Sequence, residues 1–263
     1  MFSPLYGTDN NGVPILSKSE IDIIAEQFIK EFCPSALKEP KAIDIDLFSM
    51  DYLKLEEDFQ YLSHCGVYLG MMVFNDTNKI PVYNPDNNRA EYAAAKKGTI
   101  IIDNTLLEED QERRYRFTMA HECGHWIFHR NKFMYNPNQI SLFEQPKQAV
   151  FKCRTVSLEG KTKPYTEWND NDRMEWQANY TSSALLMPRS MILKMYNCSL
   201  LKQSREKNRN IGVLSQQLFV ARISNLFNVS NQAAEIRLKN LGIIKQSNIS
   251  TFDEEYDKQF YGI

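Results

Sequence analysis

The pattern His121-Glu122-x-x-His125 constrains this chain more than any other feature of its sequence. On a helix, residues four apart lie on one face about one turn from each other, so two imidazoles at this spacing can reach one metal ion. Glu122 lies beside them, where its carboxylate can contact a water on the metal but cannot readily bind the metal. The pattern predicts a helix over about Gln111–Arg130 with a zinc site, in which Glu122 is the general base.

His129 is a third histidine on the same predicted helix, but helix geometry excludes it from the same ion. At a rise of about 1.5 Å per residue it lies about 12 Å along the axis from His121. We therefore expect His129 to support the site by a hydrogen bond or by packing. A catalytic zinc takes three protein ligands and keeps an open position, so the third ligand should come from another helix.

Glu175 is the best placed acid on the next predicted helix, which covers about Asp172–Met187. Asn179 follows one turn later on the same face and could orient a metal ligand by a hydrogen bond. Spacing alone puts Glu175 only slightly ahead of its neighbours, and we expect Asp172 to be the N-cap of the helix. The rival acids all precede Glu175: Glu167, Asp170 and Asp172.

Composition excludes several classes of protein. The 263 residues carry a net charge of −2, which argues against a surface built throughout for nucleic acid. No apolar run approaches the roughly 20 residues that span a bilayer, and Met1–Glu20 has no secretory signal pattern, so we expect a cytoplasmic protein with no membrane contact. The five cysteines are widely spaced, which indicates reduced thiols and no cysteine-based zinc site.

The periodicity of the chain predicts a helix-rich α+β fold with a small sheet. Apolar spacing favours a helix over about Ser19–Phe32 and a weaker one near Asp46–Gln60, whereas residues 84–97 show no clear pattern. Short apolar or alternating runs predict four strands: Val67–Phe74, Lys79–Tyr83, Thr99–Ile102 and Ala149–Val156.

Three regions are predicted along the chain. Residues 1–200 form a zinc metallopeptidase domain with its core at about 40–190, residues 201–245 are helical, and residues 246–263 are a polar tail. Ile223–Gly242 has the rhythm of a helix-turn-helix, whose second helix could read DNA. The side chains that such a DNA-reading helix would expose are modest in charge, so packing or partner docking is favoured over DNA contact. These side chains are Ser230, Asn231, Gln232, Arg237 and Lys239.

The residues around the motif resemble the ImmA/IrrE metallopeptidases. Arg116–Ala120 precedes the histidine motif as in that family's R-F-T-x-A-H-E-x-G-H segment. Glu175–Asn179 and Ala184–Pro188 resemble its second block, E-x-x-A-N followed by L-L-M-P, and Gly98–Asp103 resembles the strand before the zinc helix.

The resemblance implies a gluzincin-like fold in which His121, His125 and Glu175 bind Zn²⁺ and Glu122 is the catalytic acid–base. It also implies limited proteolysis of a protein substrate, often a helix-turn-helix transcriptional repressor. The 49 residues between His125 and Glu175 exceed those of shorter members and suggest an insertion. The alternative is a non-catalytic zinc-binding regulator that binds a repressor or DNA without cutting it.

Overall fold

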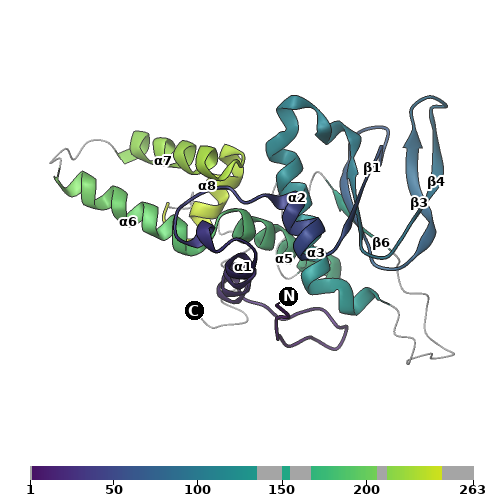
Figure 1. The fold of residues 1–263 in the computed structure, drawn as a ribbon, viewed down its shortest axis with the longest axis horizontal. Helices are drawn as coiled ribbons and strands as arrows, with labels where there is room; N and C mark the ends of the chain where they lie inside the picture. Colours follow the sequence, from purple (N-terminus) through teal and green to yellow (C-terminus); the bar gives the residue numbers. More distant parts are fainter. Residues whose placement is uncertain (1, 135–149, 155–166, 206–211, 245–263) are drawn as a thin grey trace.

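The chain folds as a helix-rich α+β protein in which helices pack beside a small sheet (Figure 1). The computed structural model describes residues 2–134, 150–154, 167–205 and 212–244. None of the helices in these ranges is long and apolar enough to cross a membrane. The longer helices are α1 (Lys18–Phe32), α3 (Glu112–Phe133), α5 (Asp170–Leu186), α6 (Arg189–Arg205), α7 (Gly212–Phe227) and α8 (Asn231–Asn240).

The main sheet has four strands in the order β1-β5-β2-β6. β1 runs parallel to β5, whereas β2 is antiparallel to both β5 and β6. All five residues of β5 are buried, and α3 packs on β2 and β5. The strands are β1 (Glu56–Gln60), β2 (Tyr68–Val73), β5 (Thr99–Asp103) and β6 (Val150–Arg154); β3 (Thr77–Asn84) and β4 (Arg89–Ala95) form a separate hairpin.

One local prediction differs from the structure. The helix expected over Asp46–Gln60 is wrong in its second half: α2 (Ile45–Leu47) and a π-helical turn (Phe48–Tyr52) are followed by the strand β1. β1 has a polar sequence and is a strand because it pairs with the buried β5, so tertiary pairing overrides local preference. Residues 84–97 contain the strand β4, while the predicted strand at Ala149–Val156 is confirmed as β6.

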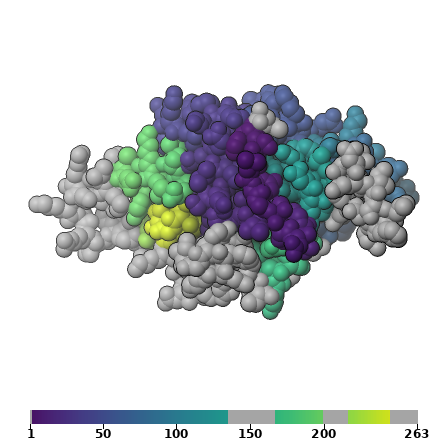
Figure 2. All heavy atoms as spheres, turned by 90° about the horizontal axis from the view of Figure 1, so that it is seen from below, coloured from purple at the N-terminus to yellow at the C-terminus, as the bar shows by residue number. Residues whose placement is uncertain are grey.

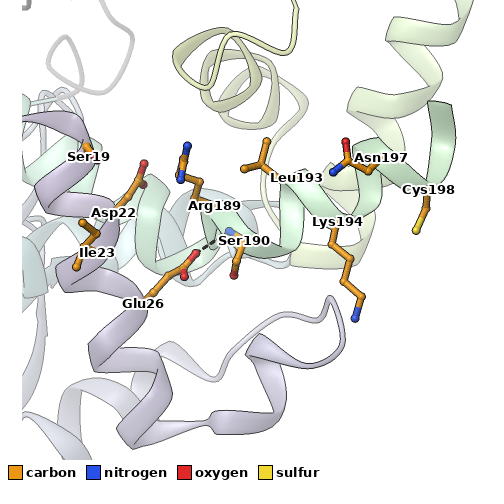
Figure 3. Close-up of a pocket in the computed structure, with 10 residues that line it drawn as sticks. All are labelled: Ser19, Asp22, Ile23, Glu26, Arg189, Ser190, Leu193, Lys194, Asn197 and Cys198. Atoms are coloured by element: carbon orange, nitrogen blue, oxygen red, sulfur yellow. Dashed lines mark hydrogen bonds between the residues drawn. The ribbon is translucent and has the colours of Figure 1, made fainter. Parts of the chain in front are cut away.

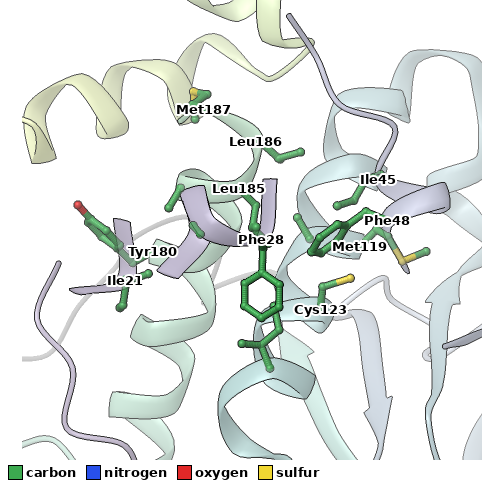
Figure 4. Close-up of a cluster of buried hydrophobic side chains, with 14 of the residues drawn as sticks. Ile21, Phe28, Ile45, Phe48, Met119, Cys123, Tyr180, Leu185, Leu186 and Met187 are labelled. Carbon is green, nitrogen blue, oxygen red and sulfur yellow. The ribbon is translucent and has the colours of Figure 1, made fainter. Parts of the chain in front are cut away.

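The core joins α1, α3 and α5 around aromatic side chains (Figure 4). Phe28 of α1 lies edge-on to Phe48, with ring centroids 6.2 Å apart. Cys123 is fully buried in this cluster together with Met119. Cys123 therefore packs in the core on the side of α3 opposite to His121 and His125.

The C-terminal helices α7 and α8 share this core. Ile223, Phe227 and Leu238 are fully buried in the same cluster as Phe28. Arg237, which a DNA-reading helix would expose, is instead buried: its side chain is 0% exposed and pairs with Asp22 of α1 at 2.6 Å. The predicted tail at 246–263 lies outside the described residues, as does most of the predicted insertion.

Candidate metal centre

Helices α3 and α5 approach closely where a glycine of one meets an alanine of the other. A Cβ atom on Gly124 would lie 3.2 Å from the Cα of Ala178 and 3.2 Å from the Cβ of Thr181. That separation is tighter than ordinary van der Waals contact, so a larger residue would push the helices apart. The close approach brings the histidines of α3 within reach of Glu175 on α5.

His121, His125 and Glu175 converge as one group able to hold a metal ion. The two Nε2 atoms of the histidines lie 2.9 Å apart. One carboxylate oxygen of Glu175 lies 3.6 Å from Nε2 of His121, and the other lies 3.6 Å from Nε2 of His125. Both histidines are fully buried, whereas the Glu175 side chain is 17% exposed.

Among the described residues, Glu175 is the only acid that joins the two histidines in this group. Asp170 instead pairs with Arg173 at 2.6 Å. The prediction that Asp172 is the N-cap is wrong, because the helix begins earlier and Asn169 caps it. Asp172 accepts from the Asn169 amide at 3.0 Å, as the third helical residue of a capping box does. Glu175 consequently lies in the second turn of α5 and does not open the helix.

The second ring nitrogen of each histidine also has a partner. Nδ1 of His121 lies 2.9 Å from Oδ1 of Asn179. Nδ1 of His125 lies 2.9 Å from Nδ1 of His129, which lies outside the metal-binding group. Nε2 of His129 is in turn 2.8 Å from Oε1 of Gln177. These contacts orient both rings with their Nε2 atoms toward Glu175.

Burial dominates the electrostatics of the group. It lowers the pKa of His121 to about 3, and the neighbouring His125 adds to this shift. Burial likewise lowers the pKa of His125 to about 3. Both rings are therefore neutral at pH 7, which is the form that binds a metal.

Glu122 lies fully buried with both carboxylate oxygens unpaired among the described residues. Burial raises its pKa well above the usual value, and the charge of Glu175 raises it further. A bound cation next to the Glu122 carboxylate would lower this pKa, since it favours the ionised form. A buried and unpaired carboxyl of this kind is costly and is typical of a functional site.

Sequence reasoning missed two residues of the centre, Gly70 and Gln177. A Cβ on Gly70 in β2 would lie 2.6 Å from Oε1 of Glu122 and 2.8 Å from Cγ2 of Thr118. Gly70 thus provides the space that the Glu122 carboxyl occupies. A glycine inside an apolar strand signals such a close approach. No comparable signal marks Gln177, because its partners come from distant parts of the chain.

A pocket of about 580 Å³ lies away from this centre, between α1 and α6 (Figure 3). Its lining includes Asp22, Glu26 and Ser190, but none of the three metal-binding candidates. Glu26 accepts a hydrogen bond from the Ser190 amide at 2.6 Å. Its carboxylate therefore caps the first turn of α6.

A histidine pair and a glutamate from two adjoining helices thus form a group able to hold a metal ion, with a further buried glutamate beside them. Residues 157–239 match the model of the peptidase family described as the IrrE N-terminal-like domain, Peptidase_M78, which is the ImmA/IrrE family. The predicted resemblance is confirmed over this range, which contains Glu175, Gln177 and Asn179. The helix with His121 and His125 precedes the matched range. A comparison with curated proteins found no match.

Proposed function

We propose that the chain is a zinc-dependent endopeptidase that cuts a protein substrate at a limited number of sites. The observation that carries this proposal is the convergence of His121, His125 and Glu175 beside the buried carboxyl of Glu122. The family match over residues 157–239 supports the peptidase class. We further propose that the metal is zinc, and we propose the roles of the residues and the class of substrate.

The donor set fits zinc. Zn–N bonds measure about 2.0–2.1 Å, so two nitrogens 2.9 Å apart can both bind one ion. Two imidazoles and one carboxylate form a ligand set known from catalytic zinc sites, whereas structural sites are usually closed and rich in cysteine. Cys123 is buried in the core, which leaves it out of the ligand set. His121, His125 and Glu175 would therefore hold the ion.

When bound, zinc would polarise the scissile carbonyl and make a water molecule more acidic at neutral pH. Glu122 would accept the proton of the attacking water and deliver it to the leaving amine. No described residue forms a hydrogen bond with its oxygens, and burial keeps bulk water from them. Asn179 and His129 would hold the two rings in their binding orientation.

Replacing Gly70 by alanine tests the placement of Glu122. The new methyl would meet Oε1 of Glu122 at 2.6 Å, so we expect the carboxyl to rotate away and the cleavage rate to fall about tenfold or more. Zinc content should stay at the wild-type level, since the three atoms nearest to the new methyl belong to Glu122 and Thr118 and to none of the proposed ligands. Gly7→Ala is the matched control, because a Cβ there meets nothing within 4 Å. An unchanged rate in the Gly70 variant would contradict the assignment.

We propose a helix-turn-helix transcriptional repressor as the substrate class. Among the described strands, β6 forms one edge of the sheet, next to β2, which carries Gly70. An extended peptide that pairs with β6 at this edge would form main-chain hydrogen bonds with it. β6 would then lie between the peptide and β2, whose Gly70 contacts Glu122. Incubating the zinc-loaded chain with candidate repressors and mapping the products by mass spectrometry tests this class.

The first measurement is metal content by elemental analysis of protein purified without chelator. We expect about one zinc per chain in the wild type and a loss of most of it in Glu175→Ala, since two imidazoles alone bind zinc weakly. Glu167→Ala is the control, because Glu167 is exposed and outside the group. Zinc retained in Glu175→Ala but lost in Glu167→Ala would reverse the ligand assignment.

A non-catalytic regulator that binds a repressor or DNA is the alternative. A salt-dependent shift of DNA by the chain, without any peptide cleavage, would favour it. The burial of Arg237 removes one of the five side chains expected to face DNA on the second helix. Glu122 argues for the enzyme, because a protein that only binds zinc has no need of a buried and unpaired carboxyl beside the ligands.

A further inference from the structure

A continuous chain of hydrogen bonds links the metal-binding histidine His125 to the N-terminal segment. Nδ1 of His125 lies 2.9 Å from Nδ1 of His129, whose Nε2 lies 2.8 Å from Oε1 of Gln177. The amide nitrogen of Gln177 then donates to the main-chain carbonyl of Pro14 at 2.6 Å. His125, His129 and Gln177 are all buried, so no bulk water competes for these bonds.

The two ends of this chain of contacts, the carbonyl of Pro14 and the ring of His125, determine which atom donates in each hydrogen bond. A carbonyl oxygen can only accept, so the NH₂ of Gln177 must face Pro14 and its Oε1 must face His129. Nε2 of His129 therefore carries a proton. A His125 ring that binds zinc through Nε2 keeps its proton on Nδ1, so Nδ1 of His125 donates and Nδ1 of His129 accepts. The Nε2 lone pair of His125 then faces Glu175 and Nε2 of His121, which lies 2.9 Å away, as one shared metal ion would require.

The loop that supplies the Pro14 carbonyl is anchored to both site helices. Asp9 pairs with Arg173 of α5, and its carboxylate also accepts from the Val13 amide at 2.9 Å. Lys132 of α3 donates to the Asn11 carbonyl at 2.8 Å. Figure 2 shows the purple N-terminal segment lying across the teal part of the chain that includes α3. These contacts hold the carbonyl of Pro14 in place.

We propose that Gln177, held by the carbonyl of Pro14, is a positioning residue that sets the ring tautomer of His125 through His129. The N-terminal loop 9–14 then helps to position the metal ligand His125. This inference rests on the proposed function, since it takes His125 as a zinc ligand. It gives a role to Gln177, whose hydrogen bonds in this chain of contacts go to His129 and Pro14 and to none of the three ligands.

The tautomers can be observed without zinc. In metal-free wild type with ¹⁵N-labelled histidine, NMR should show protons on Nε2 of His129 and on Nδ1 of His125. In Gln177→Met, which keeps the length of the side chain but removes both hydrogen bonds, we expect signals from mixed tautomers at both rings. Gln216→Met, at an exposed position of α7, is the matched control and should leave the spectrum unchanged.

Zinc affinity gives the second readout. Competition with a chelator should show about 10- to 100-fold weaker zinc binding in Gln177→Met than in the wild type or in Gln216→Met. A proton on Nε2 of His125 in the metal-free wild type would overturn the inference even if the variant failed to fold. Unchanged tautomers and affinity in a folded Gln177→Met would overturn it as well. Wild type that binds no zinc would instead refute the proposed function, while the tautomers remain measurable.

Discussion

If the proposed function is right, replacing Glu122 by glutamine should lower the rate of peptide cleavage by about 10²- to 10⁴-fold while zinc stays bound. Glutamine keeps the size of the side chain but cannot accept a proton from the attacking water. Glu122 is not one of the three ligands, so zinc content should not fall. The cleavage site is first found with a mixed peptide library and mass spectrometry, and the rate is then measured on that peptide.

The same substitution should leave the thermal midpoint equal to or above that of the wild type. Both oxygens of Glu122 are buried without a hydrogen-bond partner among the described residues, so the carboxylate costs stability in the fold. Glu109→Gln is the control, because Glu109 is exposed in the turn before α3. A Glu122→Gln protein that cuts at more than a third of the wild-type rate would refute the role of this residue as general base.

Local spacing in the sequence predicts the parts of the site that lie on one helix. His121 and His125 are one turn apart wherever this segment is helical, and α3 indeed places their Nε2 atoms 2.9 Å apart. The same geometry keeps His129 out of the metal-binding group. The α+β class and the strands β2, β3, β5 and β6 also follow from local patterns of apolar residues.

Contacts between distant segments cannot be predicted from such local patterns. Four acids near α5 had similar spacing, and only the packing of Gly124 on Ala178 shows which of them meets the histidines. β1 looks helical by composition and becomes a strand through its pairing with β5. Gln177 acts between His129 and Pro14, which lies 163 residues away in the sequence. Such roles depend on the tertiary structure and leave no local signal.

Replacing Arg237 by methionine should lower the free energy of unfolding by about 3–5 kcal/mol. The guanidinium is 0% exposed and pairs with Asp22 at 2.6 Å, and it also donates to the carbonyl of Met187 at 3.2 Å. Its charge lies 5.3 Å from the ring centroid of Tyr180. Without it, the buried Asp22 carboxylate keeps the bond from the Tyr180 hydroxyl at 3.1 Å but has no cation beside it among the described residues. Urea unfolding of both proteins measures the difference.

Lys239→Met, on the same helix, is the matched control. Lys239 pairs with Glu235 at 2.8 Å, but both side chains are partly exposed, so we expect a loss of about 0.5 kcal/mol or less.

The double variant Asp22→Leu with Arg237→Met should be more stable than Arg237→Met alone, because it leaves no buried charge without a partner. Equal losses in Arg237→Met and Lys239→Met would mean that the buried pair does not stabilise the packing of α8 on α1. A large loss in Arg237→Met alone would show that the C-terminal helices stabilise the fold that carries Glu175, since Tyr180 and Met187 lie on or next to α5.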